Sequence, residues 1–233
     1  MIDLRTFKHN STNCEALGYQ FFDELSINVK SDKILISGWA CAGKETLLSK
    51  VAAKAIDDNL KVMYFPYGGC DIFKENLVLF TKNKHRISNN LIIGDYSLNL
   101  KTLLQKRLSG ELDFDMLILE ELGLCSLSNM YDIHYSLMLK LLLTLSKKAN
   151  ISLIVNSCDI NIDFFKTDKN ININEFNKII EFDALTNPCL ENNYTARFNV
   201  VKNNNGALHK EMLLFQPRFG NKIYDMFLLK NLL

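Results

Sequence analysis

A glycine-containing segment that ends in a lysine has the clearest chemical character in this sequence. Gly38, Gly43 and Lys44 have the spacing of a phosphate-binding loop. Glycines allow the backbone to curl so that successive N–H groups point inward, and the lysine reaches the terminal phosphates of a nucleotide. The segment therefore predicts a nucleotide-binding loop, in which four residues separate the two glycines: Trp39, Ala40, Cys41 and Ala42.

The residues on either side of this loop predict the elements that would position it. Ile34, Leu35 and Ile36 form an apolar run before the first glycine and predict a buried strand. After Lys44, apolar residues recur on one face of a predicted helix: Leu47, Leu48, Val51, Ala52, Ala55 and Ile56. A helix that begins here aims the positive end of its dipole at the bound anion. The alternative is a simple tight turn between a strand and a helix.

The residue after the lysine departs from the expected pattern. A phosphate-binding loop has Ser or Thr there as a magnesium ligand, whereas this chain has Glu45, with Thr46 one position later. One alternative is that the match to the motif is accidental. Another is that Thr46 supplies the hydroxyl. One helical residue turns the Thr46 side chain away by about 100°, so this second alternative requires the helix to start at a shifted position. The third alternative is a loop that binds nucleotide while binding magnesium poorly.

A second candidate group lies at the end of a later apolar run. Glu120 and Glu121 follow the apolar run Met116–Leu119 in a strand predicted at 114–122, and Asn156 lies at the end of another strand predicted at 151–157. One carboxylate of such a group holds a magnesium ion, and a second orients or activates the attacking water. Adjacent acids after a strand are also ordinary solvated loop residues. Their order after the loop favours the functional interpretation, with Glu120 near the metal and Glu121 activating water.

The order of predicted elements indicates one α/β domain over residues 31–233, with residues 1–30 as a lead-in segment packed on it. Strands alternate with helices up to Asp159, which predicts a mainly parallel sheet with ligands at the carboxyl ends of its strands. Asp71 is placed to cap a helix that runs to about Phe80. Short strands without long helices then predict an antiparallel extension, at 178–182, 195–201, 211–215 and 223–227, with a hairpin turn near Gly206.

Composition limits the classes of function. The chain has 233 residues, 48% of them apolar, and a net charge of only +1, so contact with nucleic acid requires a local basic patch. The connector 81–86 offers three cations, Lys82, Lys84 and Arg86, although a solvated loop is the simpler interpretation. The six cysteines are widely spread, which indicates reduced thiols in a cytoplasmic protein. No apolar run is long enough to span a membrane.

In its motifs the chain resembles the RecA-like P-loop ATPases, and within them the DnaB/RepA-type replicative helicase cores and the KaiC-like ATPases. The resemblance rests on the loop, on the acidic strand end and on the strand that ends in Asn156. It rests further on the stretch from Val200 to Gly206, which is followed by Glu211–Phe215. It covers roughly residues 12–227. The resemblance implies bound ATP and Mg²⁺, with Thr46 and Glu120 at the metal and Asn156 as the polar sensor of the terminal phosphate. It also places Lys202 at a subunit boundary.

Three departures from the family pattern coincide. Glu45 replaces the hydroxyl residue, the strand after the first helix ends at Phe65 without a carboxylate, and Asn204 lies near the place of a finger arginine. Such an arginine is commonly worth about 10³-fold or more in rate, so its loss predicts a slow enzyme. Glu121 is the candidate to replace the missing acid.

Two functions therefore remain open. The first is an oligomeric ATPase that acts in DNA metabolism as a helicase-type core and contacts single-stranded DNA. Such a protein would be cytoplasmic, or located in the nucleoid or nucleus if it associates with DNA. The second is a catalytically weakened nucleotide-binding regulator or scaffold within a larger complex. Assembly into a homo-oligomer, or with related subunits, is expected in either case. A small-molecule kinase is less favoured, because the sequence has no arginine-rich lid segment.

Overall fold

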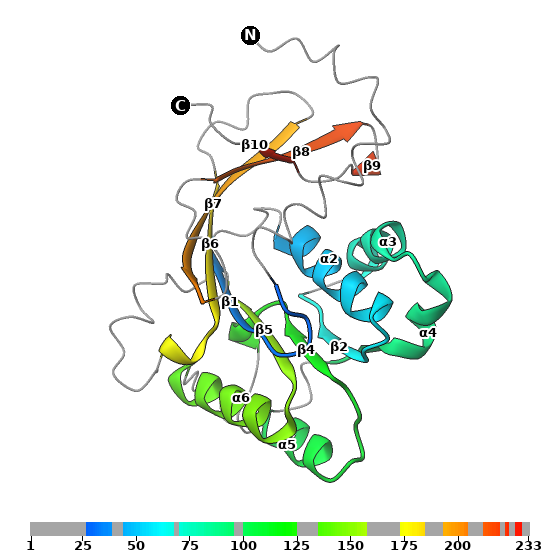
Figure 1. The fold of residues 1–233 in the computed structure, drawn as a ribbon, viewed down its shortest axis with the longest axis vertical. Coiled ribbons are helices and arrows are strands. Elements are labelled where there is room, and N and C mark those ends of the chain that lie inside the picture. Colours follow the sequence, from blue (N-terminus) through cyan, green and yellow to red (C-terminus); the bar gives the residue numbers. More distant parts are fainter. Residues whose placement is uncertain are drawn as a thin grey trace.

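A ten-stranded sheet with helices on both faces forms the framework of the computed structural model (Figure 1). The structure describes residues 27–38, 44–67, 70–95, 100–124, 135–157, 173–184, 193–204, 212–219, 222–223 and 227–229. The strand order is β10-β8-β7-β6-β1-β5-β4-β2-β3, with β9 paired to β8. The strands are β1 (Lys33–Gly38), β2 (Val62–Phe65), β3 (Leu91–Ile93), β4 (Met116–Leu119), β5 (Ser152–Ser157), β6 (Lys178–Ala184), β7 (Asn193–Asn203), β8 (Met212–Phe219), β9 (Lys222–Ile223) and β10 (Phe227–Leu229).

The six strands from β6 to β3 are all parallel, and β1 lies between β5 and β6. Their carboxyl ends therefore meet at one edge of the sheet, which we call the carboxyl edge. Beyond β6 the pairing becomes antiparallel, from β6 to β7, β7 to β8 and β8 to β10. The predicted fold class, a mainly parallel α/β sheet with a C-terminal antiparallel extension, is confirmed.

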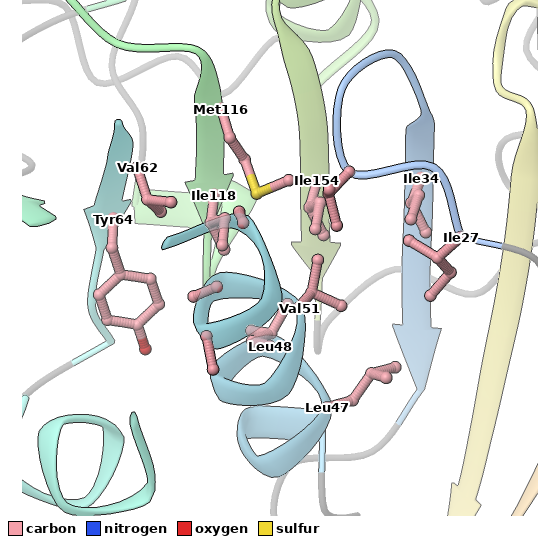
Figure 2. Close-up of a cluster of buried hydrophobic side chains, with 14 of the residues drawn as sticks. Ile27, Ile34, Leu47, Leu48, Val51, Val62, Tyr64, Met116, Ile118 and Ile154 are labelled. Carbon is pink, nitrogen blue, oxygen red and sulfur yellow. The ribbon is translucent and has the colours of Figure 1, made fainter. Parts of the chain in front are cut away.

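Helices cover the two faces of the parallel half (Figure 1). The helical segments are α2 (Lys44–Asp57), α3 (Asp71–Phe80), η2 (Lys84–Arg86), α4 (Ile87–Asn90), α5 (Leu100–Leu108), η3 (Leu122–Leu124), α6 (Tyr135–Ala149) and η4 (Ile173–Glu175). One apolar cluster joins α2 and α3 to the sheet, and the other joins α5 and α6 to the opposite face. Figure 2 shows the first cluster, in which Tyr64, Ile118 and Ile154 point from three strands toward α2. We call these the α2 face and the α6 face.

Most predicted elements lie where the sequence placed them. α3 starts at Asp71 itself, so the predicted capping role is wrong, and Cys70 occupies the N-cap position without a side-chain hydrogen bond. The strand predicted at 223–227 corresponds to two short strands, β9 and β10. Ile27 and Val29 pack in the core, whereas residues 1–26 and the predicted turn at Gly206 lie outside the described residues. Within the described part of the chain, no helix has the length and apolar character needed to cross a membrane.

The connector after α3 is fastened to the end of α2 by one carboxylate. Asp57 Oδ1 and Oδ2 accept hydrogen bonds from the backbone N–H groups of Asn83 and Lys82 at 2.8 and 3.0 Å. Arg86 Nη1 donates to the Asp57 carbonyl at 2.6 Å, while the side chains of Lys82 and Lys84 are exposed. The solvated-loop interpretation of this connector therefore agrees with its local structure, and phosphate contact by its cations stays a prediction.

Replacing Asp57 should destabilise this connector measurably. We expect Asp57→Ala to lower the free energy of unfolding by about 1–3 kcal/mol, because it removes three hydrogen bonds, from the Lys82 N–H, the Asn83 N–H and Asn83 Nδ2. The matched control is Asp58→Ala, which removes an exposed ion pair with Lys54. This control should change the free energy of unfolding by less than about 0.5 kcal/mol. Urea denaturation of both variants measures the difference, and equal losses would contradict this account.

Candidate nucleotide-binding site

The end of β1 passes so close to β6 that only glycine fits there. Gly38 has φ +113°, and a Cβ at this position would lie 1.7 Å from the carbonyl oxygen of Phe182. The glycine therefore serves a close backbone approach as well as the start of the predicted loop. Five residues of that loop, Trp39, Ala40, Cys41, Ala42 and Gly43, lie outside the described residues.

Lys44 begins α2 and is buried beside the end of β1. Its side chain is only 4% exposed, and Nζ donates a hydrogen bond to the Gly38 carbonyl over 2.5 Å. The ammonium group thus lies at the carboxyl edge, beside the end of β1. The next residue, Glu45, is half-buried, and the side chain of Thr46 is outside the described residues. The metal-binding role of Thr46 stays a prediction.

Glu120 lies directly after β4, at the same edge and on the α2 face. Its Oε2 accepts two hydrogen bonds, from the Tyr64 hydroxyl at 2.6 Å and from the Tyr67 backbone N–H at 2.5 Å. Neither tyrosine was among the predicted site residues. Tyr64 was missed because an aromatic side chain within an apolar strand is typical of core, and only the pairing of β2 with β4 reveals its contact.

The carboxyl group of Glu120 interacts electrostatically with both Glu45 and Lys44. Burial raises the pKa of Glu45 from 4.5 to about 7, and the negative charge of Glu120 contributes to the rise. Burial also raises the pKa of Glu120, while its hydrogen bonds from Tyr64 and Tyr67 and the positive charge of Lys44 act in the opposite direction. The residue at the position where a phosphate-binding loop has Ser or Thr is therefore a carboxyl group close to the predicted metal ligand.

Asn156 connects β5 to this group. Its Nδ2 donates to the Glu120 carbonyl over 2.5 Å, and the side chain is 2% exposed. Its Oδ1 has no hydrogen-bond partner within the part of the chain that the structure describes. A buried amide oxygen without a donor can accept a hydrogen bond from a ligand or its water. The structure thus brings Asn156 next to Glu120, as the sequence predicted.

Glu121 points to the other face of the sheet. Its Oε1 accepts hydrogen bonds from the Gly123 N–H at 2.9 Å and from the Ser157 hydroxyl at 3.3 Å, and the side chain is 3% exposed. Ser157 follows Val155 by two residues on β5, and Val155 packs in the α6-face cluster. Glu121 is therefore adjacent to Glu120 in sequence but is held on the opposite face. Its part in water activation stays a prediction.

Lys202 lies at the opposite edge of the sheet from Gly38. In the β6–β7 pairing Lys202 faces Ile179, near the start of β6, whereas Gly38 pairs with Phe182, near its end. Its Nζ donates to the Asn174 carbonyl at 2.8 Å, within the same chain. The structure does not bring Lys202 together with Lys44 and Glu120. Its role at a subunit boundary stays a prediction.

The oxygen groups at this edge fit a magnesium ion. Mg²⁺ prefers carboxylate and amide oxygens, and in nucleotide sites it is commonly held by one or two carboxylates together with phosphates and water. Glu120 Oε1 and Asn156 Oδ1 accept no hydrogen bond from any residue that the structure describes. Among the described residues there is no cluster of three or more His, Cys, Asp or Glu suitable for a metal.

Two solved structures have a fold similar to that of this chain. No protein-family model and no curated protein matches the sequence. The flagellar accessory protein FlaH from Methanocaldococcus jannaschii matches in structure with a TM-score of 0.59 and 15% identity, over 91% of this chain and 96% of that chain. A DnaB-like replicative helicase, whose structure was described with its interactions with primase, matches with a TM-score of 0.64 and 13% identity, over 91% of this chain. The match spans 62% of the helicase chain.

At these identities the likeness shows the fold alone. The chain has a RecA-like fold near that of the DnaB-like helicase, as its motifs predicted.

Proposed function

Because the chain has a RecA-like fold with a lysine, a carboxylate and an amide gathered at one edge of the sheet, we propose that it binds ATP with Mg²⁺ at the carboxyl edge. The observation that carries this proposal is the convergence of Lys44, Glu120 and Asn156, which come from three different segments of the chain. These are the residue types that hold phosphate, cation and terminal phosphate oxygens, respectively.

Each group has a distinct part in this proposal. The backbone from Gly38 to Thr46 and the start of α2 bind the phosphates, and Lys44 neutralises their charge. Glu120 and Thr46 hold the magnesium ion, and Asn156 senses the terminal phosphate through a bound water that donates a hydrogen bond to its Oδ1. When bound, the ion screens the negative charge of the phosphates and of the developing leaving group. Glu121 is the candidate for orienting water if the nucleotide is hydrolysed.

Calorimetric titration with ATP, with and without Mg²⁺, tests this proposal directly. We expect saturable binding that is tighter with Mg²⁺, and a parallel phosphate-release assay separates binding from turnover. Absence of any ATP binding at low salt would contradict the proposal. Single-stranded DNA added to both assays tests the proposed role as an oligomeric ATPase in DNA metabolism, for which stimulated turnover is the expected sign. Light scattering with and without nucleotide measures assembly.

A second function is favoured by what surrounds Glu120. β2 and the residues after it, from Val62 to Tyr67, contain no carboxylate, and the Glu45 carboxyl lies close to Glu120. Both features oppose efficient hydrolysis, because the usual water-activating acid is missing and a second negative charge faces the phosphates. A nucleotide-binding regulator or scaffold of a larger complex accounts for them. Magnesium-dependent ATP binding without turnover is the result expected of that alternative.

Neutralising Glu45 should strengthen ATP binding more at high pH than at low pH. With a pKa of about 7, the carboxyl group is mostly charged at pH 8 and mostly neutral at pH 6. Glu45→Gln removes the repulsion between this charge and the phosphates, so we expect affinity to rise about three- to tenfold at pH 8 and little at pH 6. Titrations without divalent cations measure this, with Glu75→Gln on an exposed position of α3 as the control. Weaker binding by Glu45→Gln at pH 8 would contradict the expectation.

A further inference from the structure

Tyr64 is a buried residue of β2 whose hydroxyl contacts the acid at the end of β4. The side chain is 0% exposed, and its Oη donates to Glu120 Oε2 over 2.6 Å. Tyr64 pairs with Ile118, two residues before Glu120, so both side chains lie on the same face of neighbouring strands. A hydrogen bond to a carboxylate is stronger than one between neutral groups, so this contact is suited to fixing the orientation of the acid.

The ring of Tyr64 has little freedom to move. It stacks on Phe73 of α3 with a centroid separation of 3.6 Å and an interplanar angle of 7°. Phe73 is itself fully buried, and Figure 2 shows Tyr64 on the face of the sheet that α2 covers. The packing of β2 against α3 therefore sets the position of the hydroxyl, and the hydroxyl sets that of Glu120.

Both donors act on the same oxygen of Glu120. The Tyr67 N–H lies 2.5 Å from Oε2, the atom that Tyr64 also contacts, whereas Oε1 accepts no hydrogen bond from the described part of the chain. The backbone of Glu120 is held as well, through its carbonyl, by Asn156 Nδ2. One carboxylate oxygen is thus engaged by the protein, and the other is left as a possible ligand.

We propose that Tyr64 is a positioning residue that holds Glu120 Oε2 so that Oε1 is presented to the Mg²⁺ of the bound nucleotide. This inference rests on the proposed ATP-binding function. Hydrogen bonds to the outer atoms of metal ligands orient those ligands, and losing one typically costs about 10- to 100-fold in metal affinity. In this chain the donor is a tyrosine from the strand next to the acid.

Tyr64→Phe tests the inference, because it removes the hydroxyl and keeps the stacked ring. ATP binding is measured by calorimetry over a series of Mg²⁺ concentrations, together with thermal unfolding. We expect the Mg²⁺ concentration that gives half of the maximal increase in ATP affinity to rise about 10- to 100-fold. ATP binding in EDTA should stay unchanged. The matched control is Tyr135→Phe, the same substitution on α6 at the opposite face, which should leave the Mg²⁺ dependence as it is.

The outcomes separate this inference from the function on which it rests. If the unaltered chain shows no Mg²⁺-dependent ATP binding, the proposed function and the inference are both overturned. If the unaltered chain depends on Mg²⁺ and Tyr64→Phe depends on it equally, the inference alone is overturned. Equal weakening of ATP binding with Mg²⁺ and in EDTA would show that the hydroxyl maintains the fold of the site without acting on the metal, and would also overturn it.

Discussion

Lys44→Ala is expected to weaken ATP binding about 100-fold. A hydrogen bond between an ammonium group and a phosphate is worth about 1.5–3 kcal/mol, and each 1.4 kcal/mol is a tenfold change in affinity. The effect should lie near the upper end of that range because Lys44 is 4% exposed, so that water screens its charge poorly. Calorimetric titration of the variant with Mg·ATP measures the loss.

The control for this experiment is another lysine of the same helix. Lys54→Ala removes a cation near the other end of α2, where the ammonium group is solvent-exposed and paired with Asp58. We expect its affinity for ATP to equal that of the unaltered chain. If Lys44→Ala also bound ATP with unchanged affinity, the nucleotide would have to bind elsewhere, and the proposed site would be wrong.

Gly38→Ala should destabilise the whole domain by about 2–6 kcal/mol. A methyl group at this position would lie 1.7 Å from the Phe182 carbonyl oxygen, so β1 and β6 would have to separate at the carboxyl edge. The backbone φ of +113° adds a strain that alanine cannot relieve, and each of these two effects costs about 1–3 kcal/mol. Urea denaturation followed by circular dichroism measures the change.

Gly110→Ala separates strain from collision in this test. Gly110 also has a positive φ, of +80°, but no atom lies within 4 Å of the position that a Cβ would take. We expect this control to cost only about 1–2 kcal/mol, since it carries the backbone strain alone. Similar losses in the two variants would contradict the close approach of β1 to β6. A Gly38→Ala chain that does not fold, beside a folded Gly110→Ala chain, would agree with it.

The parallel half of the sheet could be predicted because its signals are local. Apolar runs such as Ile34–Ile36 and Met116–Leu119 are β1 and β4, and the residues that end these runs lie at the carboxyl edge. The chain order of loop, acidic strand end and polar strand end was enough to place Lys44, Glu120 and Asn156 near one another, because parallel strands share one functional edge.

The parts that were missed depend on pairing between distant segments. The contact of Tyr64 with Glu120 arises from the register of β2 and β4, which no local pattern contains. Glu121 shows a different limit. Successive residues of a strand point to opposite faces, so the pleat separates two acids that look equivalent in the sequence. α4, a single turn of four residues, was too short to give a periodic signal.

The position of β1 in the sheet also determines how much of the chain must be made before β1 can pair with its neighbours. β1 precedes its partners β5 and β6 by more than a hundred residues, and the Lys33 N–H donates to the side chain of Asn177, 144 residues later. Chains dominated by such distant contacts fold slowly, since a long loop must close before the contacts form. During synthesis both sides of the strand that carries Gly38 therefore lack their partners until β5 and β6 have been made, and the antiparallel strands β7 to β10 can join the sheet only after β6.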